Sequence, residues 1–175
     1  MKKLYFLLIV CLLILGINAP VAFGQESPAP VIRELRALIE SGKTNFQKDV
    51  GVLADIDTAS GIGIYKTRKP SPGATTVILQ SVEGGKRIYM IRYDTKTMST
   101  DSLIVMNQIV NLYIDELNAM IKSGLYTGSD TTDDYGMAVT IMKDLAGNHI
   151  LDYKSDKTMQ AIYLYGLFSE SKQSK

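Results

Sequence analysis

Several residue types are nearly missing from this chain of 175 residues, and their scarcity limits the chemistry that it can perform. There is no tryptophan, one histidine (His149) and one cysteine (Cys11). Cys11 lies within an apolar run over residues 4–17, so the rest of the chain has no thiol. Disulfides, thiol nucleophiles and thiolate metal ligands are therefore excluded beyond that run.

The first 24 residues are predicted to be a secretory signal. Lys2 and Lys3 precede the apolar run, and Ala22 and Gly24 place small residues at the two positions that a signal peptidase reads. We expect cleavage between Gly24 and Gln25, and a periplasmic or secreted destination in a bacterium. The alternative is a membrane anchor that is retained, but the run is shorter than the ~20 apolar residues that a spanning helix needs.

An excess of either charge is also lacking. Nineteen Lys and Arg residues stand against 18 Asp and Glu. Loss of Lys2 and Lys3 with the signal would leave 17 basic residues, and a net charge of about −1. A protein with this balance has no electrostatic reason to bind nucleic acid or an anionic membrane surface. We expect no nucleic-acid partner, and no membrane span after signal removal.

Hydrophobic spacing predicts two helices, each followed by strands. The first helix covers residues 31–41, with a stripe of apolar side chains and Gly42 as its stop. The second covers residues 100–123, capped by Ser99 or Thr100. Strands are expected at residues 62–67, 75–82, 87–93, 137–143, 150–154 and 159–167. Residues 43–60 are polar and mixed, and residues 127–134 are predicted to be a polar loop.

The predicted order is one helix and three strands, twice. We therefore expect a single α+β domain over residues 25–168, followed by a tail at 169–175. It would contain two tandem α-βββ units, about 28–94 and 99–168, with both helices on one face of antiparallel strands. Residues 31–42 match 113–124 at seven positions, which favours an internal duplication, although amphipathic helices also converge. Residues 88–90 likewise resemble 162–164. Whether both units share one sheet is left open.

This order of elements resembles that of β-lactamase-inhibitor-protein-like domains. An early helix ending near Phe46 and Gly51, a strand with Tyr65 and a turn at residues 72–74 are also similar to small uncharacterised exported bacterial proteins. The resemblance covers most of the chain after the signal. It implies a binding or inhibitory scaffold and supplies no catalytic residues.

Candidate reactive groups are few. His149 follows a Gly-Asn turn, where an exposed histidine without a catalytic partner is the simpler interpretation. Asp130, Asp133 and Asp134 lie in the predicted polar loop without the alternation of a calcium-binding loop, so a solvated loop is the simpler interpretation. An exported hydrolase that uses His149 or the residues 130–134 is the enzymatic alternative. We expect no catalytic residue, metal or cofactor.

The ten tyrosines are more informative. Period-two alternation places Tyr89 and Tyr93 on one face of their strand, and Tyr163 and Tyr165 on one face of the last strand. We expect the aliphatic faces of both strands to lie under the helices and the tyrosines to point away. An outward face of tyrosines suits contact with a protein or peptide, although tyrosine is also common in ordinary strands.

The sequence thus predicts a non-catalytic exported binding protein that uses the open face of its sheet. Its predicted partner-binding residues are Tyr89, Tyr93, Tyr163, Tyr165, Arg87 and Arg92, with the two arginines near the edge. A structural or envelope-associated role is a further alternative. The chain could fill such a role by forming a homodimer along an exposed strand edge. The identity of the partner is beyond the sequence.

Overall fold

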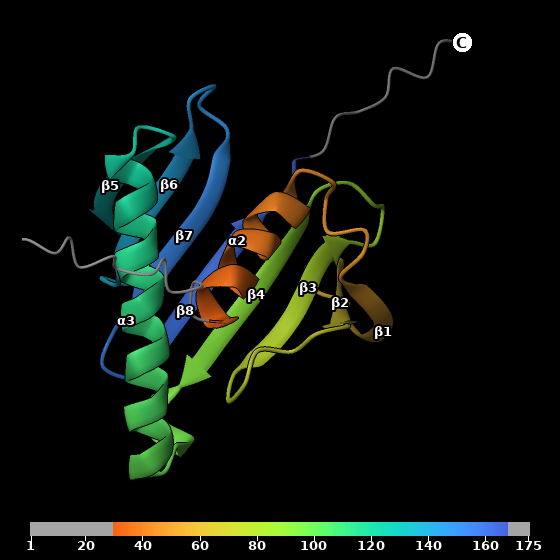
Figure 1. Cartoon of the computed structure of the whole chain (residues 1–175). Helices are drawn as coiled ribbons and strands as arrows, with labels where there is room; N and C mark the ends of the chain where they lie inside the picture. Colours follow the sequence, from red (N-terminus) through yellow and green to blue (C-terminus); the bar gives the residue numbers. More distant parts are fainter. Residues whose placement is uncertain (1–29, 168–175) are drawn as a thin grey trace, which may run out of the picture.

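The computed structural model describes residues 30–167, so the predicted signal and the tail from residue 169 lie outside the described residues. Within this range the chain forms two α-helices, a short 3-10 helix and eight β-strands, whose arrangement is drawn in Figure 1. In chain order these are α2 (Pro30–Gly42), β1 (Val50–Asp57), β2 (Ile62–Thr67), β3 (Thr75–Ser81), β4 (Arg87–Asp94), η1 (Thr95–Thr97), α3 (Thr100–Lys122), β5 (Tyr126–Thr132), β6 (Ala138–Asp144), β7 (His149–Ser155) and β8 (Met159–Tyr165).

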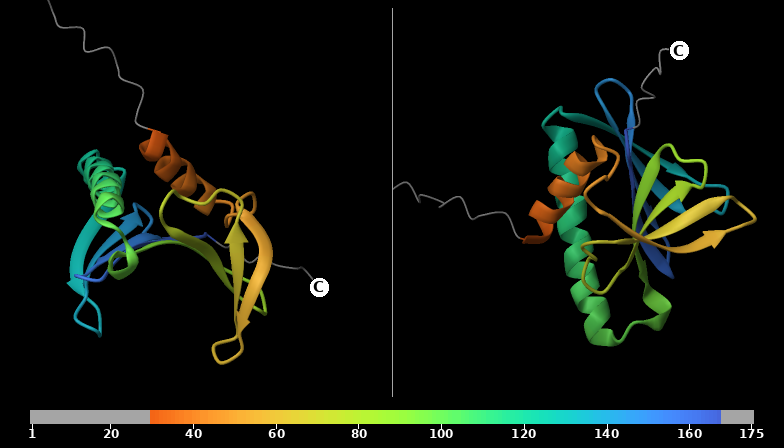
Figure 2. Two further views of the ribbon diagram at one scale, coloured as in Figure 1. Left: turned by 90° about the horizontal axis from the view of Figure 1, so that it is seen from below. Right: turned by 90° about the vertical axis from the view of Figure 1, so that its right-hand side faces the viewer.

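All eight strands belong to one antiparallel sheet, in the order β1-β2-β3-β4-β8-β7-β6-β5. Both helices lie on the same side of this sheet (Figure 1). The sheet is arched, with the helices on its outer side, and the opposite face is concave (left view of Figure 2). The α+β class and the antiparallel sheet are therefore confirmed. The two halves share one sheet, because β4 pairs with β8 at its centre.

The prediction of three strands per unit is wrong, because each helix is followed by four. The additional strands, β1 and β5, are the two edges of the sheet. In β1, every residue from Val52 to Asp57 is exposed, and β5 is exposed beyond Tyr126. An edge strand that buries neither face has no alternation of apolar and polar residues, so its sequence has the appearance of a loop.

The two helices bury the stripes that their spacing predicts. Leu35, Leu38 and Ile39 of α2 are buried, and the buried side chains of α3 recur every three or four residues. The Ser99 side chain caps α3 by accepting from the Ser102 backbone N–H at 3.3 Å. Within residues 30–167, neither helix has the length and apolar composition needed to cross a bilayer.

An ion pair joins the two helices. The Arg36 Nε donates to Glu116 Oε1 at 2.7 Å, and a second guanidinium nitrogen donates to Oε2 at 3.1 Å. The side chain of Glu116 is 8% exposed, whereas that of Arg36 is 52% exposed. Because water reaches the Glu116 carboxylate poorly, its negative charge is stabilised mainly by Arg36. The contact fixes the helices as one layer over the sheet.

Candidate binding face of the sheet

The face of the sheet that points away from the helices carries a continuous group of apolar side chains. The strand register places Ile64, Leu79, Ile88 and Tyr165 in one row across four strands. The adjacent row contains Val77, Met90 and Tyr163. We call these seven side chains the apolar band. All of them are half-buried, so neighbouring strands pack against them, but no second layer formed by residues 30–167 covers them.

The alternate residues of the same strands confirm which face is open. Ile78 of β3, Tyr89 of β4 and Leu164 of β8 pair across the sheet and are each no more than 1% exposed. They belong to the core beneath the helices. Because successive side chains of a strand point to opposite faces, their neighbours in sequence lie on the open face.

On β8 the alternation is as the sequence predicts. Ile162 and Leu164 are 2% and 1% exposed and lie in the core, whereas Tyr163 and Tyr165 are half-buried on the opposite face. A partner-binding role for these two tyrosines stays a prediction.

On β4 the expected orientation is wrong. Tyr89 and Tyr93 are 1% and 2% exposed in the core, and Ile88 and Met90 occupy the open face instead. The helix side accommodates the larger rings because the Tyr89 ring packs against Phe46, at 5.7 Å between centroids. The Tyr89 hydroxyl also donates to the Lys69 carbonyl at 3.1 Å. Burial raises the pKa of both tyrosines to about 12.

The two arginines separate in the same way. Arg87 lies on the helix side, where its guanidinium donates to Gln80 Oε1 at 2.9 Å and to the Asn45 carbonyl at 3.1 Å. It is therefore not at the edge of the open face, and that prediction is wrong. Arg92 lies on the open face, because it alternates with Tyr93 of the core and pairs with Thr75 and Ala161. Its side chain is exposed. Of the six predicted contact residues, the fold brings Tyr163, Tyr165 and Arg92 to this face.

A buried carboxylate lies beside the apolar band, and sequence reasoning did not single it out. Asp152 of β7 is 7% exposed and pairs with Tyr163 in the sheet. Its Oδ1 is 2.5 Å from His149 Nε2, and its Oδ2 accepts from the Tyr165 hydroxyl at 2.7 Å. Burial and this hydrogen bond raise the pKa of Tyr165 above its ordinary value.

A strand irregularity brings His149 and Asp152 together. Residues three apart in a regular strand point to opposite faces. Met142 pairs with Leu151, but the next residue, Lys143, pairs with His149, so Ile150 is an extra residue. This bulge puts His149 on the same face as Asp152. The isolated acidic residue in an apolar strand was the only sequence signal for the cluster.

Two of the acidic residues that the sequence singles out, Asp130 of β5 and Asp133 just after it, already have partners. Asp130 accepts from the Thr140 hydroxyl at 2.7 Å, and Asp133 lies 3.2 Å from the Lys154 ammonium. Backbone hydrogen bonds, above all from Met137, hold the pKa of Asp133 below its ordinary value. Within residues 30–167, no three His, Cys, Asp or Glu residues are grouped closely enough to bind a metal.

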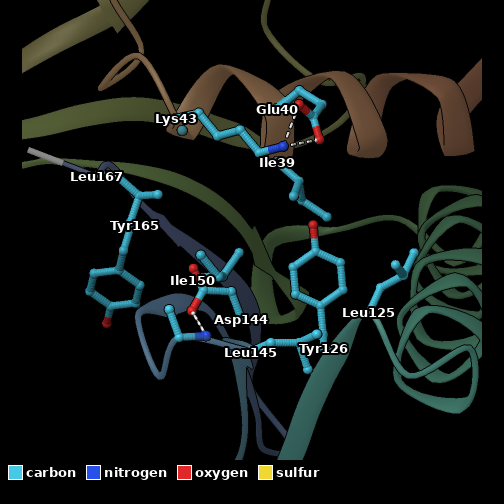
Figure 3. A pocket seen from close by; sticks show the side chains of 12 residues that line it. Ile39, Glu40, Lys43, Leu125, Tyr126, Asp144, Leu145, Ile150, Tyr165 and Leu167 are labelled. Carbon is cyan, nitrogen blue, oxygen red and sulfur yellow. Dashed lines mark hydrogen bonds and ion pairs between the residues drawn. The ribbon is translucent and has the colours of Figure 1, made fainter.

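A cleft of about 460 Å³ opens between the end of α2, the start of β5 and the β6–β7 turn (Figure 3). Leu125 and Leu145 line it and are 63% and 72% exposed. Its charged groups already have partners: Lys43 pairs with Glu40 at 2.8 Å, and Asp144 accepts from its own turn. Tyr165, the final residue of β8, also lines the cleft.

Comparison with protein-family models, with curated proteins and with solved structures gave no match, so the role of this face is argued from its own residues.

Proposed function

We propose that this chain is an exported, non-catalytic binding protein that holds a protein or peptide on the concave face of its sheet. The observation that carries the proposal is the apolar band, whose seven side chains lie half-buried on a face that no other described part of the chain covers. A contiguous apolar surface bordered by polar residues is typical of an interaction site. The predicted secretory signal is the basis for the exported location.

The chemistry of the band suits a contact surface. Tyr163 and Tyr165 offer large rings with few rotatable bonds, so little side-chain entropy is lost on binding. Ile64, Leu79 and Met90 add apolar surface beside the two rings. All are held on paired antiparallel strands, so a partner would meet a surface that is already formed instead of one that must order on contact.

The test is site-specific photo-cross-linking in cells of the source organism. p-Benzoylphenylalanine replaces Tyr163 on the open face, and in a matched variant it replaces Ile104, which is 54% exposed on α3. We expect a discrete adduct from position 163 only. That adduct should disappear when Met90→Asp is added, because a carboxylate would then interrupt the band.

Three results would overturn the proposal: no adduct at position 163, equal adducts at both positions, or an adduct that persists with Met90→Asp. An adduct formed only with a second copy of the chain would favour the homodimer alternative instead.

One observation favours a second candidate, an exported hydrolase. The imidazole of His149 is held by a buried carboxylate, as in many general bases. The Nε2 atom contacts Asp152, so Nδ1 would have to take the proton. A screen of ester, amide and glycoside substrates should show activity that disappears in His149→Ala. Activity that survives this substitution would exclude the histidine mechanism.

A further inference from the structure

The apolar band is bordered by cationic side chains on both sides. Lys86 lies on one side, with its Nζ atom 5.2 Å from the centroid of the Tyr165 ring. Lys154 lies on the other side, 5.7 Å from the Tyr163 ring. These distances are within the range in which an ammonium is attracted to an aromatic face. The two tyrosines are therefore flanked by positive charge at the centre of the open face.

Further cations extend this border. Arg92 pairs with Ala161, which also pairs with Lys154, so the two cations lie in one row next to the band. Lys66 pairs with Val77 at the end of the second row, and Lys143 pairs with His149. Lys66, Lys86 and Lys143 are exposed, and no ion pair engages any of them within residues 30–167.

The nearby carboxylates are largely occupied. Both oxygens of Asp152 are taken by His149 and Tyr165. Asp133 is bound to Lys154, and Asp94 lies 3.7 Å from Arg92. Asp55 and Asp57 remain negatively charged at the β1 edge, where they accept hydrogen bonds from their own turn and strand but pair with no cation among the described residues. Away from the β1 edge, Lys66, Lys86 and Lys143 are consequently exposed charges that none of these carboxylates neutralises.

From this arrangement we infer that the partner contributes an acidic, amphipathic peptide segment, and this inference rests on the proposed function. Apolar side chains of the segment lie on the band, and its carboxylates meet Lys66, Lys86 and Lys143. Complementary charge of this kind sets orientation and association rate, while the apolar contacts hold the complex.

The experiment uses protein purified after export by its source organism and four fluorescein-labelled 14-residue peptides. Three share the same leucine and phenylalanine positions and carry Glu, Gln or Lys elsewhere, and the fourth contains only Glu and Ser. Fluorescence anisotropy at low salt should show the apolar Glu peptide binding about tenfold more tightly than the Gln peptide. Added salt should reduce this preference, because exposed charges are screened.

Charge reversal then locates the contact. Lys66→Glu should weaken binding of the apolar Glu peptide several-fold and leave the Gln peptide unchanged. Lys122→Glu, in the last turn of α3, is the matched control and should change neither affinity.

The outcomes separate the two proposals. Equal binding of the Glu and Gln peptides, with both weakened by Tyr163→Ser, would overturn the acidic preference and leave the binding face intact. Equal binding of the two Glu peptides would show attraction of any polyanion and would overturn the amphipathic segment. If no peptide binds, the inference is wrong, and the cross-linking at position 163 still decides the proposed function.

Discussion

Tyr89 and Met90 are neighbours in β4, but they belong to two very different surfaces. Tyr89 is 1% exposed beneath the helices, and its hydroxyl is bound to a backbone carbonyl. Met90 lies half-buried on the concave face, between Val77 and Tyr163. The helix side is a closed core in which ring volume contributes to stability. The concave side also carries apolar side chains, but no layer of the described residues covers them, so a partner can reach them.

The largest expected effect separates tyrosines on the two faces. Tyr89→Ser should lower the free energy of unfolding by about 3–5 kcal/mol, as removal of a buried ring usually does. Tyr163→Ser, on the open face, should lower it by about 1 kcal/mol or less, because the ring is only partly buried. Urea denaturation of both variants measures the difference. Equal losses would show that Tyr163 is also a core residue and would remove it from the binding face.

The next effect concerns the buried carboxylate of Asp152 on the open face. Asp152→Ala should cost about 1–3 kcal/mol, because it leaves the Tyr165 hydroxyl and the His149 imidazole without their partner. Asp130→Ala removes an exposed acceptor on the helix side of β5, and it should cost about 0.5 kcal/mol or less. Thermal unfolding of the two variants tests this order, and a reversed order would contradict the structural role of Asp152.

A third prediction uses the alkaline titration of the core. The pKa of Tyr89 and of Tyr93 is raised to about 12 by burial, from an unfolded value of about 10. Above about pH 10 the unfolded chain loses these protons and the folded chain keeps them, so stability must fall as pH rises from 10 toward 12. Near pH 11 the loss is about 1 kcal/mol for each residue. Tyr93→Phe should reduce this slope in pH-dependent denaturation, and an unchanged slope would contradict the assignment.

The smallest effect isolates one hydrogen bond on the open face. Tyr165→Phe removes the donor to Asp152 Oδ2 and should cost about 1 kcal/mol. Tyr163→Phe should cost less, because no hydrogen bond of the Tyr163 hydroxyl is present among the described residues. Chemical denaturation with both variants resolves the difference. A larger loss for Tyr163→Phe would mean that its hydroxyl has a structural partner.

The sequence predicts most of the regular structure because most elements bury one face. Both helices and six strands follow from apolar periodicity, and the Ser99 cap follows from residue type. β1 and β5 could not be found in this way. Residues 127–132 of β5 are polar at almost every position, and only their pairing with β6 makes them a strand.

The orientation of β4 was beyond the sequence for a different reason. Both faces of this strand are apolar, with Ile88 and Met90 on one side and Tyr89, Ile91 and Tyr93 on the other. Composition alone favours the aliphatic face for the core. The orientation of the strand instead depends on residues distant in the chain. The Phe46 ring packs against Tyr89, and the Lys69 carbonyl accepts a hydrogen bond from its hydroxyl. The cluster around Asp152 was missed for another reason. The bulge at Ile150, which the sequence does not reveal, brings His149 to the same face as Asp152.

The seam between β4 and β8 has a consequence for how the chain can reach its native state. β8 is inserted beside β4 in the middle of the sheet, although it begins more than 60 residues after β4 ends. Closing so large a loop is entropically costly and slows the pairing of β4 with β8. Until β8 pairs, the edges of β4 and β7 that it joins are exposed, and Ile162 and Leu164 have not entered the core. A chain truncated before residue 159 would therefore lose the element that joins its halves, and would retain two incomplete sheets in place of a shortened version of this one.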